Sequence, residues 1–419
     1  MEATAEITAA VKNVPALRFP EFEGEWVKKS IGSIAVKVGS GSTPLGGEKA
    51  YQDTGIPFIR SQNVNDDKLI LGNVSFISEE INDKMKGSIV RANDMLLNIT
   101  GGSIGRSCVV PDDFIVGNVN QHVCIIRLDK QNNPAFLQAH LSSYNGQKSL
   151  ERSQVGSGRE GLNFQSIRLI KFAFPTIAEQ QKIASFLSAV NDKLQQLSKK
   201  KELLEKYKKG AMQQLFSRQI RFKDDNGHDF PEWEEKRLKD VAKRVTIKNK
   251  KDDINFVLTN SATQGIVSQQ DYFDKDIANQ ENLEGYYVVD VDDFVYNPRI
   301  STAAPVGPIK RNKLAKGVMS PLYTVFRFEK QNLEFLEFFF ETTVWHRYMK
   351  SVANYGARHD RMSITNDDLL GLPIPVPCQA EQQKITAFLS AIDNKLYYTK
   401  TQLEQAQQFK KGLLQQMFV

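Results

Sequence analysis

The sequence has little cysteine, little histidine and no long apolar run. Its 419 residues include three cysteines (Cys108, Cys124 and Cys378), which are too few and too scattered for a disulfide framework. No apolar stretch approaches the roughly 20 residues that a membrane-spanning helix needs. The N-terminus lacks the basic region and apolar core of a signal peptide, so we expect a cytoplasmic protein with no membrane partner.

Catalytic and metal-binding signatures are also missing. The five histidines form no HExxH motif, and Cys124, two residues after His122, has no second ligand pair to complete a metal site. There is no GxxxxGK[ST] nucleotide loop, no GxSxG nucleophile elbow and no Asn-Pro-Pro-aromatic tetrapeptide. The Gly-rich stretch 101–105 suits a turn beside a strand better than a phosphate cradle. We therefore expect no catalytic residue, no metal and no bound cofactor.

Composition places the chain among ordinary folded proteins. Hydrophobic residues make up 41% and charged residues 25% of it, which excludes wholesale disorder. A chain of this length suits two globular units. The formal net charge is +6 with a pI near 8.9. This charge suits a polyanion such as nucleic acid, but many basic proteins bind none.

The most informative feature that is present is an internal repeat. Residues 179–194 (EQQKIASFLSAVNDKL) and 381–396 (EQQKITAFLSAIDNKL) are identical at 11 of 16 positions. The register continues without a gap to KKGAMQQLF at 208–216 and KKGLLQQMF at 410–418. One chain therefore presents one type of surface twice.

Both copies have the pattern of a long helix. Apolar residues follow 4-3 spacing over about five heptads, which is typical of a coiled coil and not of a helix packed against a sheet. About 38 residues per helix would extend roughly 57 Å. Lys201 and Lys208 interrupt the first seam, and Thr399 and Lys410 the second. The seam residues are Ile183, Leu187, Val190, Leu194, Leu197, Leu204, Ala211 and Leu215 in the first copy, and Ile385, Leu389, Ile392, Leu396, Leu403, Ala406, Leu413 and Met417 in the second.

The segments before these helices predict an α+β fold that is also repeated. Apolar runs at 95–99, 123–128, 294–296 and 323–328 are typical of strands, and 136–142 and 333–347 are typical of helices. Gly- and Ser-rich stretches at 39–43, 101–105 and 156–161 indicate loops. The spacing of Thr176 and Glu179 predicts a capping box at the start of the first long helix, and the second copy lacks this pattern. The repetition in these segments is weaker than in the helices: residues 25–26 resemble 232–233, 94–98 resemble 293–297, and 117–132 resemble 317–332.

Several of these motifs resemble one protein family. Residues 39–44 (GSGSTP), with Tyr51 and 55–59 (GIPFI), are similar to the opening signature of the specificity subunit of type I restriction–modification systems. Residues 94–98 with 101–106 (GGSIGR) are similar to its mid-domain strand and turn. Pro175 with 179–184 resembles the entry to its conserved helix. The second half lacks the SGSTP loop, and residues 260–264 (NSATQ) fill a comparable place.

The resemblance implies a two-domain architecture without catalysis. It predicts an N-terminal extension over 1–16, target recognition domains over 17–177 and 219–378, and conserved helical spacers over 178–218 and 379–419 that pair as an antiparallel coiled coil with pseudo-twofold symmetry. Each recognition domain would read one half of a bipartite, asymmetric site in double-stranded DNA. The helices would set the unread gap and dock two methyltransferase subunits. Those partners would use S-adenosylmethionine, and restriction and translocase subunits in the same prokaryotic complex would use ATP and Mg²⁺.

Base reading needs hydrogen-bond donors and acceptors at groove edges, and phosphate contacts fix the register. We assign these roles to polar loop residues, each of which could also be a simply solvated side chain. In residues 60–63 (RSQN), a guanidinium suited to guanine accompanies amides suited to adenine. The candidates in the first domain are Ser42, Thr43, Arg60, Gln62, Asn63, Thr100, Arg106, Asn120, Gln121, His122, Arg152, Ser157, Arg159 and Asn163. Those in the second are Lys248, Lys250, Asn260, Arg299, Tyr323, Asn354, Tyr355, Arg358, His359 and Arg361.

Two alternative functions remain open at this point. The globular units could form a nucleotide-modifying enzyme with an unrecognised active site, and the purified chain would then bind S-adenosylmethionine. The chain could also be a coiled-coil scaffold without DNA affinity, which would show no salt-sensitive DNA binding. The Lys- and Gln-rich helix faces are compatible with plain solvation, and the resemblance more than the composition implies that they dock methyltransferase subunits.

Overall fold

The computed structural model describes residues 13–419 apart from 66, 157–160, 251–252, 273–282 and 354–359. The chain divides into two compact units. Unit 1 combines the chain up to Ser198 with Thr401–Val419, and unit 2 is Lys199–Lys400. Within the described ranges, no helix has both the length and the apolar character needed to cross a bilayer.

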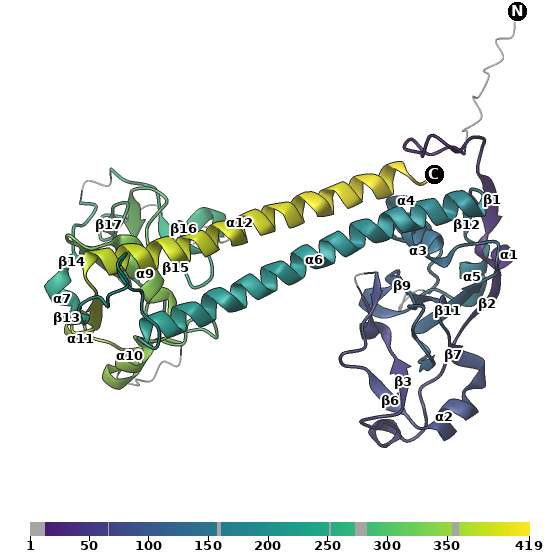
Figure 1. Cartoon of the computed structure of the whole chain (residues 1–419), viewed down its shortest axis with the longest axis horizontal. Helices are drawn as coiled ribbons and strands as arrows, with labels where there is room; N and C mark the ends of the chain where they lie inside the picture. Colours follow the sequence, from purple (N-terminus) through teal and green to yellow (C-terminus); the bar gives the residue numbers. More distant parts are fainter. Residues whose placement is uncertain (1–12, 66, 157–160, 251–252, 273–282, 354–359) are drawn as a thin grey trace, which may run out of the picture. The chain divides into compact units, whose positions relative to one another are not determined.

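Two long helices, α6 (Ile177–Phe216) and α12 (Gln379–Gln416), lie where the repeat predicts them (Figure 1). They contain 40 and 38 residues, close to the predicted length. The Glu179 N–H donates to Thr176 Oγ1 at 3.4 Å, so Thr176 caps α6 as expected. The Glu179 carboxylate does not complete the capping box, however, because it binds Arg18 instead.

Every predicted seam residue is buried or half-buried. In unit 1 the start of α6, with Ile183 and Leu187, shares a core with Leu413 near the end of α12. In unit 2 the Tyr207 ring, near the end of α6, lies 6.3 Å from the Phe388 ring near the start of α12. The helices are therefore antiparallel, as predicted. The seam differs from that of a free coiled coil, because its outer turns also pack into the cores of the globular parts.

Unit 1 contains two four-stranded sheets. One has the order β2-β11-β8-β9, and the other has the order β6-β3-β10-β7 and includes the parallel pair β3–β10. Strand β1 pairs with β12, and β4 pairs with β5 in a short hairpin. The strands are β1 (Val27–Ser30), β2 (Ala35–Ser40), β3 (Ile56–Ile59), β4 (Val64–Asn65), β5 (Lys68–Leu69), β6 (Ser75–Ile77), β7 (Ile89–Val90), β8 (Met95–Asn98), β9 (Ser107–Val109), β10 (Gly117–Val119), β11 (Val123–Leu128) and β12 (Lys171–Phe174). The short helices are α1 (Ile31–Ile34), α2 (Glu79–Lys84), α3 (Pro134–Ser142), α4 (Tyr144–Arg152) and α5 (Phe164–Leu169), with 3₁₀ turns η1 (Gly47–Ala50), η2 (Ser61–Asn63), η3 (Lys86–Ser88) and η4 (Gly101–Ser103).

The central strands of unit 1 face two cores because successive side chains of a strand point to opposite faces. Met95 and Leu97 of β8 pack with the helices, whereas Leu96 packs against the second sheet. Strand β11 divides in the same way, with Ile126 on the helix side and Ile125 on the other. The near-continuous apolar runs that predicted these strands reflect this two-sided burial.

Unit 2 repeats much of this framework. Its four-stranded sheet has the order β14-β21-β18-β19, and the pairs β15–β16, β17–β20 and β13–β22 accompany it. The strands are β13 (Glu234–Arg237), β14 (Ala242–Val245), β15 (Leu258–Ser261), β16 (Gly265–Ser268), β17 (Tyr287–Val289), β18 (Phe294–Tyr296), β19 (Ile309–Arg311), β20 (Gly317–Met319), β21 (Thr324–Phe328) and β22 (Pro373–Val376). The helices are α7 (Leu238–Val241), α8 (Gln269–Tyr272), α9 (Leu333–Glu341), α10 (His346–Val352) and α11 (Asn366–Leu370).

An ion pair with a buried aspartate recurs at equivalent places in the two units. Arg127 Nε lies 2.6 Å from Asp94 Oδ1, and Arg327 Nε lies 2.6 Å from Asp293 Oδ1. Both carboxylates are fully buried. The aspartates begin the repeated motifs at 94–98 and 293–297, so these motifs mark equivalent places in the two units.

One predicted helix is divided in two. Residues 333–347 were expected to form a single helix, but α9 ends at Glu341 and α10 begins at His346. Thr342 has an extended backbone (φ −82°, ψ 173°), and its hydroxyl donates to the Phe339 carbonyl at 2.7 Å. This local hydrogen bond competes with helix continuation, which the apolar pattern alone does not reveal.

Candidate nucleic-acid interface

Four loops of unit 1 meet at one end of its two sheets. The last residue of β2 pairs with Cys124 near the start of β11, and the last residue of β8 pairs with Val123. Because β3 and β10 are parallel neighbours, their carboxyl ends also lie together. The loops after β2, β3, β8 and β10 therefore converge. We call residues 41–43, 60–63, 100–106 and 120–122 the first loop cluster.

Hydrogen bonds join these loops to one another. The Thr43 hydroxyl donates to Gln121 Oε1 at 2.6 Å, and Thr100 Oγ1 lies 2.6 Å from His122 Nδ1. These four candidate side chains are exposed or half-buried. Ser42 is exposed beside them. Residues predicted from separate stretches of sequence thus lie side by side at this end of unit 1.

Gly41 allows the closest approach between two of these loops. Its N–H donates to the Asn120 carbonyl at 3.3 Å. A Cβ at Gly41 would lie 1.8 Å from the Val119 carbonyl oxygen, whereas a Cβ at Gly39 would meet nothing within 4 Å. The second glycine of the GSGSTP motif is therefore a steric requirement for this contact.

Two arginines of the first loop cluster are held by neighbouring side chains. Arg60 Nη2 donates to Ser75 Oγ at 2.9 Å, and its guanidinium lies 5.7 Å from the centre of the Tyr51 ring. Arg106 is exposed, and its Nη1 donates to Asn65 Oδ1 at 2.8 Å. A guanidinium held in this way loses less conformational entropy when it binds a base or phosphate. Gln62, next to Arg60, is exposed.

Three amide candidates of unit 1 are used by the protein's own backbone. Asn63 is 2% exposed, and its amide donates to the Ile70 carbonyl at 2.9 Å. Asn120 Oδ1 accepts from the His122 N–H at 3.0 Å. Asn163 caps α5 and is exposed. In this conformation Asn63 and Asn120 shape the loops and do not present free edges to a base.

The remaining candidates of unit 1 lie apart or cannot be placed. Arg152 is exposed at the end of α4, and in the described part of the chain no recorded hydrogen bond or ion pair connects it to the first loop cluster. Ser157 and Arg159 lie outside the described residues.

The same end of unit 2 carries a second set of loops. Val257, just before β15, forms a parallel bridge with Val318 of β20. This matches the parallel pairing of β3 with β10 in unit 1. Asn297 Nδ2 donates to the Asn260 carbonyl at 2.9 Å, just as Asn98 Nδ2 donates to the Ser61 carbonyl at 2.9 Å. Residues 260–264 therefore correspond to the turn at 60–63, and the comparison with the SGSTP loop was wrong. The loop after β14 holds that place instead.

Most candidates of unit 2 that can be placed gather at these loops. Lys248 and Lys250 are exposed after β14. Arg299 is exposed and forms an antiparallel bridge with Arg361, which brings two guanidinium groups onto adjacent backbone segments. The Tyr323 hydroxyl lies 3.1 Å from Thr259 Oγ1. We call residues 248–250, 260–264, 297–300, 320–323 and 361 the second loop cluster.

One placed candidate of unit 2 is structural, and four cannot be placed. Asn260 is 3% exposed, and its amide donates to the Val295 carbonyl at 2.7 Å. Its side chain holds β15 to β18 and offers no edge to a base. The candidates outside the described residues are Asn354, Tyr355, Arg358 and His359.

Each long helix begins at a buried carboxylate that the sequence reasoning missed. In unit 1 the Glu179 carboxylate accepts from Arg18 at 2.8 Å and from the Trp26 indole N–H at 3.3 Å. In unit 2 the Glu381 carboxylate accepts from Arg221 at 2.9 Å and from the Trp233 indole N–H at 2.8 Å. The repeated EQQK and Glu-Trp motifs could have indicated the glutamate and the tryptophan. The arginines stand at different distances from their tryptophans, so no repeat identifies them. The sets are Glu179, Arg18 and Trp26, and Glu381, Arg221 and Trp233.

The chemistry of the clusters is that of recognition. Burial raises the pKa of Cys108 and of Cys124 to about 12, so both remain protonated thiols at neutral pH. Across the described stretches, no three His, Cys, Asp or Glu side chains gather closely enough to hold a metal ion. The exposed groups are guanidinium, ammonium, amide and hydroxyl groups, which suit phosphates and base edges.

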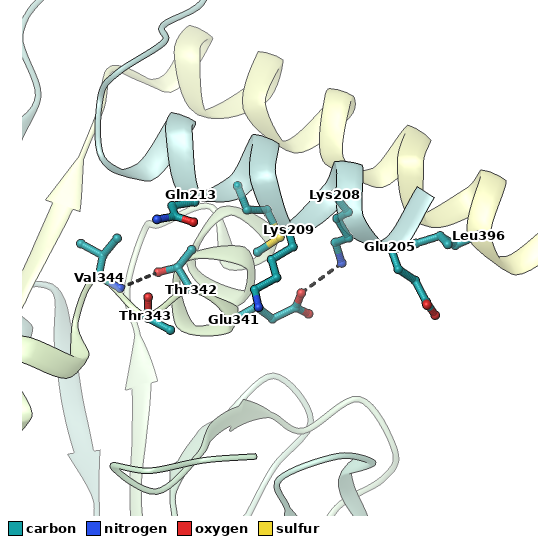
Figure 2. A pocket seen from close by; sticks show the side chains of 10 residues that line it. Glu205, Lys208, Lys209, Gln213, Glu341, Thr342, Thr343, Val344 and Leu396 are labelled. Carbon is teal, nitrogen blue, oxygen red and sulfur yellow. Dashed lines mark hydrogen bonds and ion pairs between the residues drawn. The ribbon is translucent and has the colours of Figure 1, made fainter. Parts of the chain in front are cut away.

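Unit 2 also contains a cavity of about 250 Å³ between α6 and the α9–α10 connection (Figure 2). Met212, Val344 and Leu396 supply apolar walls. Lys208 points toward Glu341 at its edge, with Nζ 3.0 Å from Oε2 (Figure 2). The cavity lies beside the long helix and is lined by none of the candidate residues of the second loop cluster.

Comparison with known proteins gives a consistent result. Residues 23–206 and 231–408 each match the type I restriction modification DNA specificity domain. The chain is 23% identical over 424 residues to the putative type I restriction enzyme MjaX specificity subunit of Methanocaldococcus jannaschii, covering 96% of this chain and 95% of that protein. It is 35% identical over 132 residues to the EcoBI specificity subunit of Escherichia coli, covering 31% of this chain and 27% of that protein.

Two solved structures have the same fold. One is the type I restriction–modification S subunit from M. genitalium. The match covers 97% of this chain and 99% of that subunit, with a TM-score of 0.56 and 16% identity. A second match is a chain from a structure of complex assembly and conformational transition in the type I R-M system. The match covers 93% of this chain and 96% of that chain, with a TM-score of 0.54 and 16% identity. The likeness extends over both units and both long helices.

Proposed function

The chain belongs to the type I restriction–modification DNA specificity family, and on this premise we propose that each loop cluster reads one half of a bipartite, asymmetric site in double-stranded DNA. The chain is a specificity subunit and not an enzyme. The observation that carries the proposal is the recurrence of one framework with different polar loops at the same end. Two readers of different composition suit two different half-sites.

Within the first loop cluster, we assign base reading to exposed groups that the protein does not use itself. Gln62 can pair with adenine through its amide, and Arg106 can contact guanine or a phosphate. Thr43 with Gln121, and Thr100 with His122, form two hydrogen-bonded pairs in the same cluster, and these pairs would exchange their bonds for contacts with DNA. Removing one good base contact should cost about 1–3 kcal/mol, or roughly 5- to 150-fold in affinity for the correct base.

Within the second loop cluster, we assign phosphate contacts to Lys248 and Lys250. Arg299 and Arg361 are the candidates for guanine, because their backbones are bridged and both carry a guanidinium. Tyr323 and Arg361 are partly buried, so they would act at the base of the loops. Positive charge on exposed loops makes DNA affinity fall with rising salt concentration.

We further propose that the helices act as a spacer and docking surface. The recognition domains would extend over 17–177 and 219–378, after an N-terminal extension at 1–16, and the spacers over 178–218 and 379–419. The exposed Lys and Gln residues on the helices would bind two methyltransferase subunits. Those subunits would supply S-adenosylmethionine chemistry, and restriction and translocase subunits joined through the complex would use ATP and Mg²⁺.

The decisive experiment is adenine-methylation mapping of the host genome with and without this gene. We expect a two-part motif that disappears on deletion and returns on complementation. A methylation pattern that does not change on deletion would refute the proposal. Saturable binding of S-adenosylmethionine by the purified chain would favour an enzyme instead.

Variants then assign the half-sites. Gln62→Ala and Arg106→Ala should relax one half of the motif, and Arg299→Ala should relax the other. Lys171→Ala, an exposed charge on β12 outside both clusters, is the matched control and should change neither half. An effect of Gln62→Ala on both halves would contradict the division of labour.

A further inference from the structure

The hairpin of β4 and β5 links the first loop cluster to a long helix. On one side, Asn65 Oδ1 accepts from Arg106 Nη1 at 2.8 Å, and the Val64 carbonyl accepts from Asn98 Nδ2 at 3.3 Å. On the other side, Lys68 donates to Gln195 of α6. The hairpin therefore contacts both an exposed DNA-contact candidate and the helical part of unit 1.

Asp67, in the turn between β4 and β5, contacts two helices of unit 1. Its Oδ1 accepts from Gln138 Nε2 at 2.7 Å and from Ser142 Oγ at 2.9 Å, both on α3. Its Oδ2 lies 2.7 Å from Lys410 Nζ on α12. The side chains of Asp67 and Lys410 are only 22% and 20% exposed. A charge-assisted contact shielded in this way is stronger than a surface ion pair.

The backbone of Asp67 supports a specific role. Its φ of +60° is in the left-handed region, which costs a residue other than glycine about 1 kcal/mol or more. Such strain persists where surrounding contacts hold the residue in place. The three side-chain partners of Asp67 supply those contacts, so they hold Asp67 in a conformation that its backbone does not prefer.

Unit 2 shows what the same framework does without this hairpin. Lys208, the repeat counterpart of Lys410, pairs with Glu341 at the end of α9 and with Asp393 on α12. In unit 1 the last residue of α3 is Ser142, and Asp67 supplies the carboxylate instead. The lysine at this helix position thus meets a carboxylate in both units.

The difference between the units lies in the connection after the equivalent strands. Only residues 262–264 separate β15 from β16, whereas residues 60–74 separate β3 from β6 and include the hairpin. In unit 2 the space beside Lys208 and Glu341 is the cavity of Figure 2. The hairpin is therefore an addition to the shared framework, and Asp67 connects that addition to the helix.

We propose that Asp67 is a positioning residue for recognition of the first half-site. Its contact with Lys410, 343 residues away in the sequence, holds the hairpin so that Asn65 presents Arg106 to DNA. This inference rests on the proposed function of the first loop cluster. It makes the C-terminal helix a determinant of how faithfully the first recognition domain reads DNA.

The test uses the complete complex of this chain with its methyltransferase subunits. Methylation rates are measured on duplexes with the correct site and with single-base changes in either half. Asp67→Asn keeps the shape and removes the charge, and Lys410→Met removes the partner at a distance from the loops. Each variant should lower the rate at the correct site about 3- to 10-fold, which lies within the roughly 2- to 30-fold effect of long-range coupling, mainly through a higher KM. Discrimination in the first half should fall, and discrimination in the second half should not.

Two controls separate positioning from general stability. Glu341→Gln breaks the equivalent contact of Lys208 in unit 2 and should leave first-half discrimination unchanged. The double variant Asp67→Asn with Lys410→Met should be no worse than either single variant, because both remove the same contact. Thermal unfolding and binding of methyltransferase subunits are measured for every variant.

Several results would overturn the inference. One is unchanged first-half discrimination in Lys410→Met, a variant chosen because it leaves the hairpin sequence intact. Others are equal loss of discrimination in both halves, or purely additive effects in the double variant. These outcomes concern the Asp67 contact alone. A wild-type complex that methylates no bipartite site would instead refute the proposed function.

Discussion

His140 is buried in unit 1 at a place where unit 2 has phenylalanine. It lies on α3 with no exposed surface, and its ring centre is 4.2 Å from that of Phe172 and 4.8 Å from that of Phe418. Phe339 holds the equivalent position on α9, with its ring 5.9 Å from Phe216. His140→Phe therefore introduces into unit 1 the side chain that the other copy of the framework already accommodates.

The substitution should remove a pH dependence of stability. Burial lowers the pKa of His140 from 6.5 to about 3, and the nearby Val419 backbone opposes this shift only in part. The folded protein keeps the imidazole neutral, whereas the unfolded chain takes up a proton below its own pKa. Stability is therefore lost as the pH falls from 6.5 toward 3. Between pH 7 and pH 5 this single residue should cost about 2 kcal/mol.

The assay is urea denaturation of the full chain at pH 7, 6 and 5, with hydrogen exchange of α3 peptides to report unit 1 separately. Wild type should lose about 2 kcal/mol more than His140→Phe over this range, and the two should be similar at pH 7. His228→Gln, which changes an exposed histidine of unit 2, is the control and should retain the wild-type slope. Parallel pH dependences of wild type and His140→Phe would refute the reasoning.

Three further changes test the helices and the loops. One heptad inserted into both long helices lengthens each by about 10 Å. The methylated motif should therefore keep both half-sites, and the gap between them should widen by about three base pairs at roughly 3.4 Å each. Altered half-sites with an unchanged gap would argue against a spacer. Glu381→Gln leaves Arg221 without its buried counter-charge, and denaturant titration should show a loss of about 2–3 kcal/mol, reduced from the fully buried case because the arginine is partly exposed. Gly41→Ala forces a Cβ to 1.8 Å from the Val119 carbonyl and should impair methylation at sites that depend on the first half, whereas the unobstructed Gly39→Ala should not.

Local, periodic signals allowed most of the framework to be predicted. The long helices follow from 4-3 spacing, and β11 has the predicted bounds because a run of apolar residues buried on both faces has few alternatives. The break at Thr342 was not predicted, because a side-chain hydrogen bond to Phe339 leaves no mark on the apolar pattern. The arginines that bind Glu179 and Glu381 were missed for a similar reason, since their contacts span 160 residues or more of sequence.

The loop residues show a different limit of sequence reasoning. Asn63 and Asn260 have side chains that suit adenine, and residue type alone made them candidates. Both are buried, and both donate their amides to backbone carbonyls that hold the loops in shape. The amide of a loop asparagine can form the same hydrogen bonds with a base or with the protein's own backbone. Only its surroundings in the folded protein distinguish these two uses.

The arrangement of the repeat explains how the two readers can differ while their supports do not. The buried carboxylates of Asp94 and Asp293, paired with Arg127 and Arg327, link the central strands of both units, each with an Nε–Oδ1 distance of 2.6 Å. The polar loops emerge beyond these pairs, where an insertion such as the β4–β5 hairpin adds polar contacts while Val64 joins the existing core of the second sheet. Each unit also combines the first half of one long helix with the last half of the other. Both helices therefore support both readers, but a single helix substitution such as Lys410→Met, like a change in a loop, acts on the reader of its own unit.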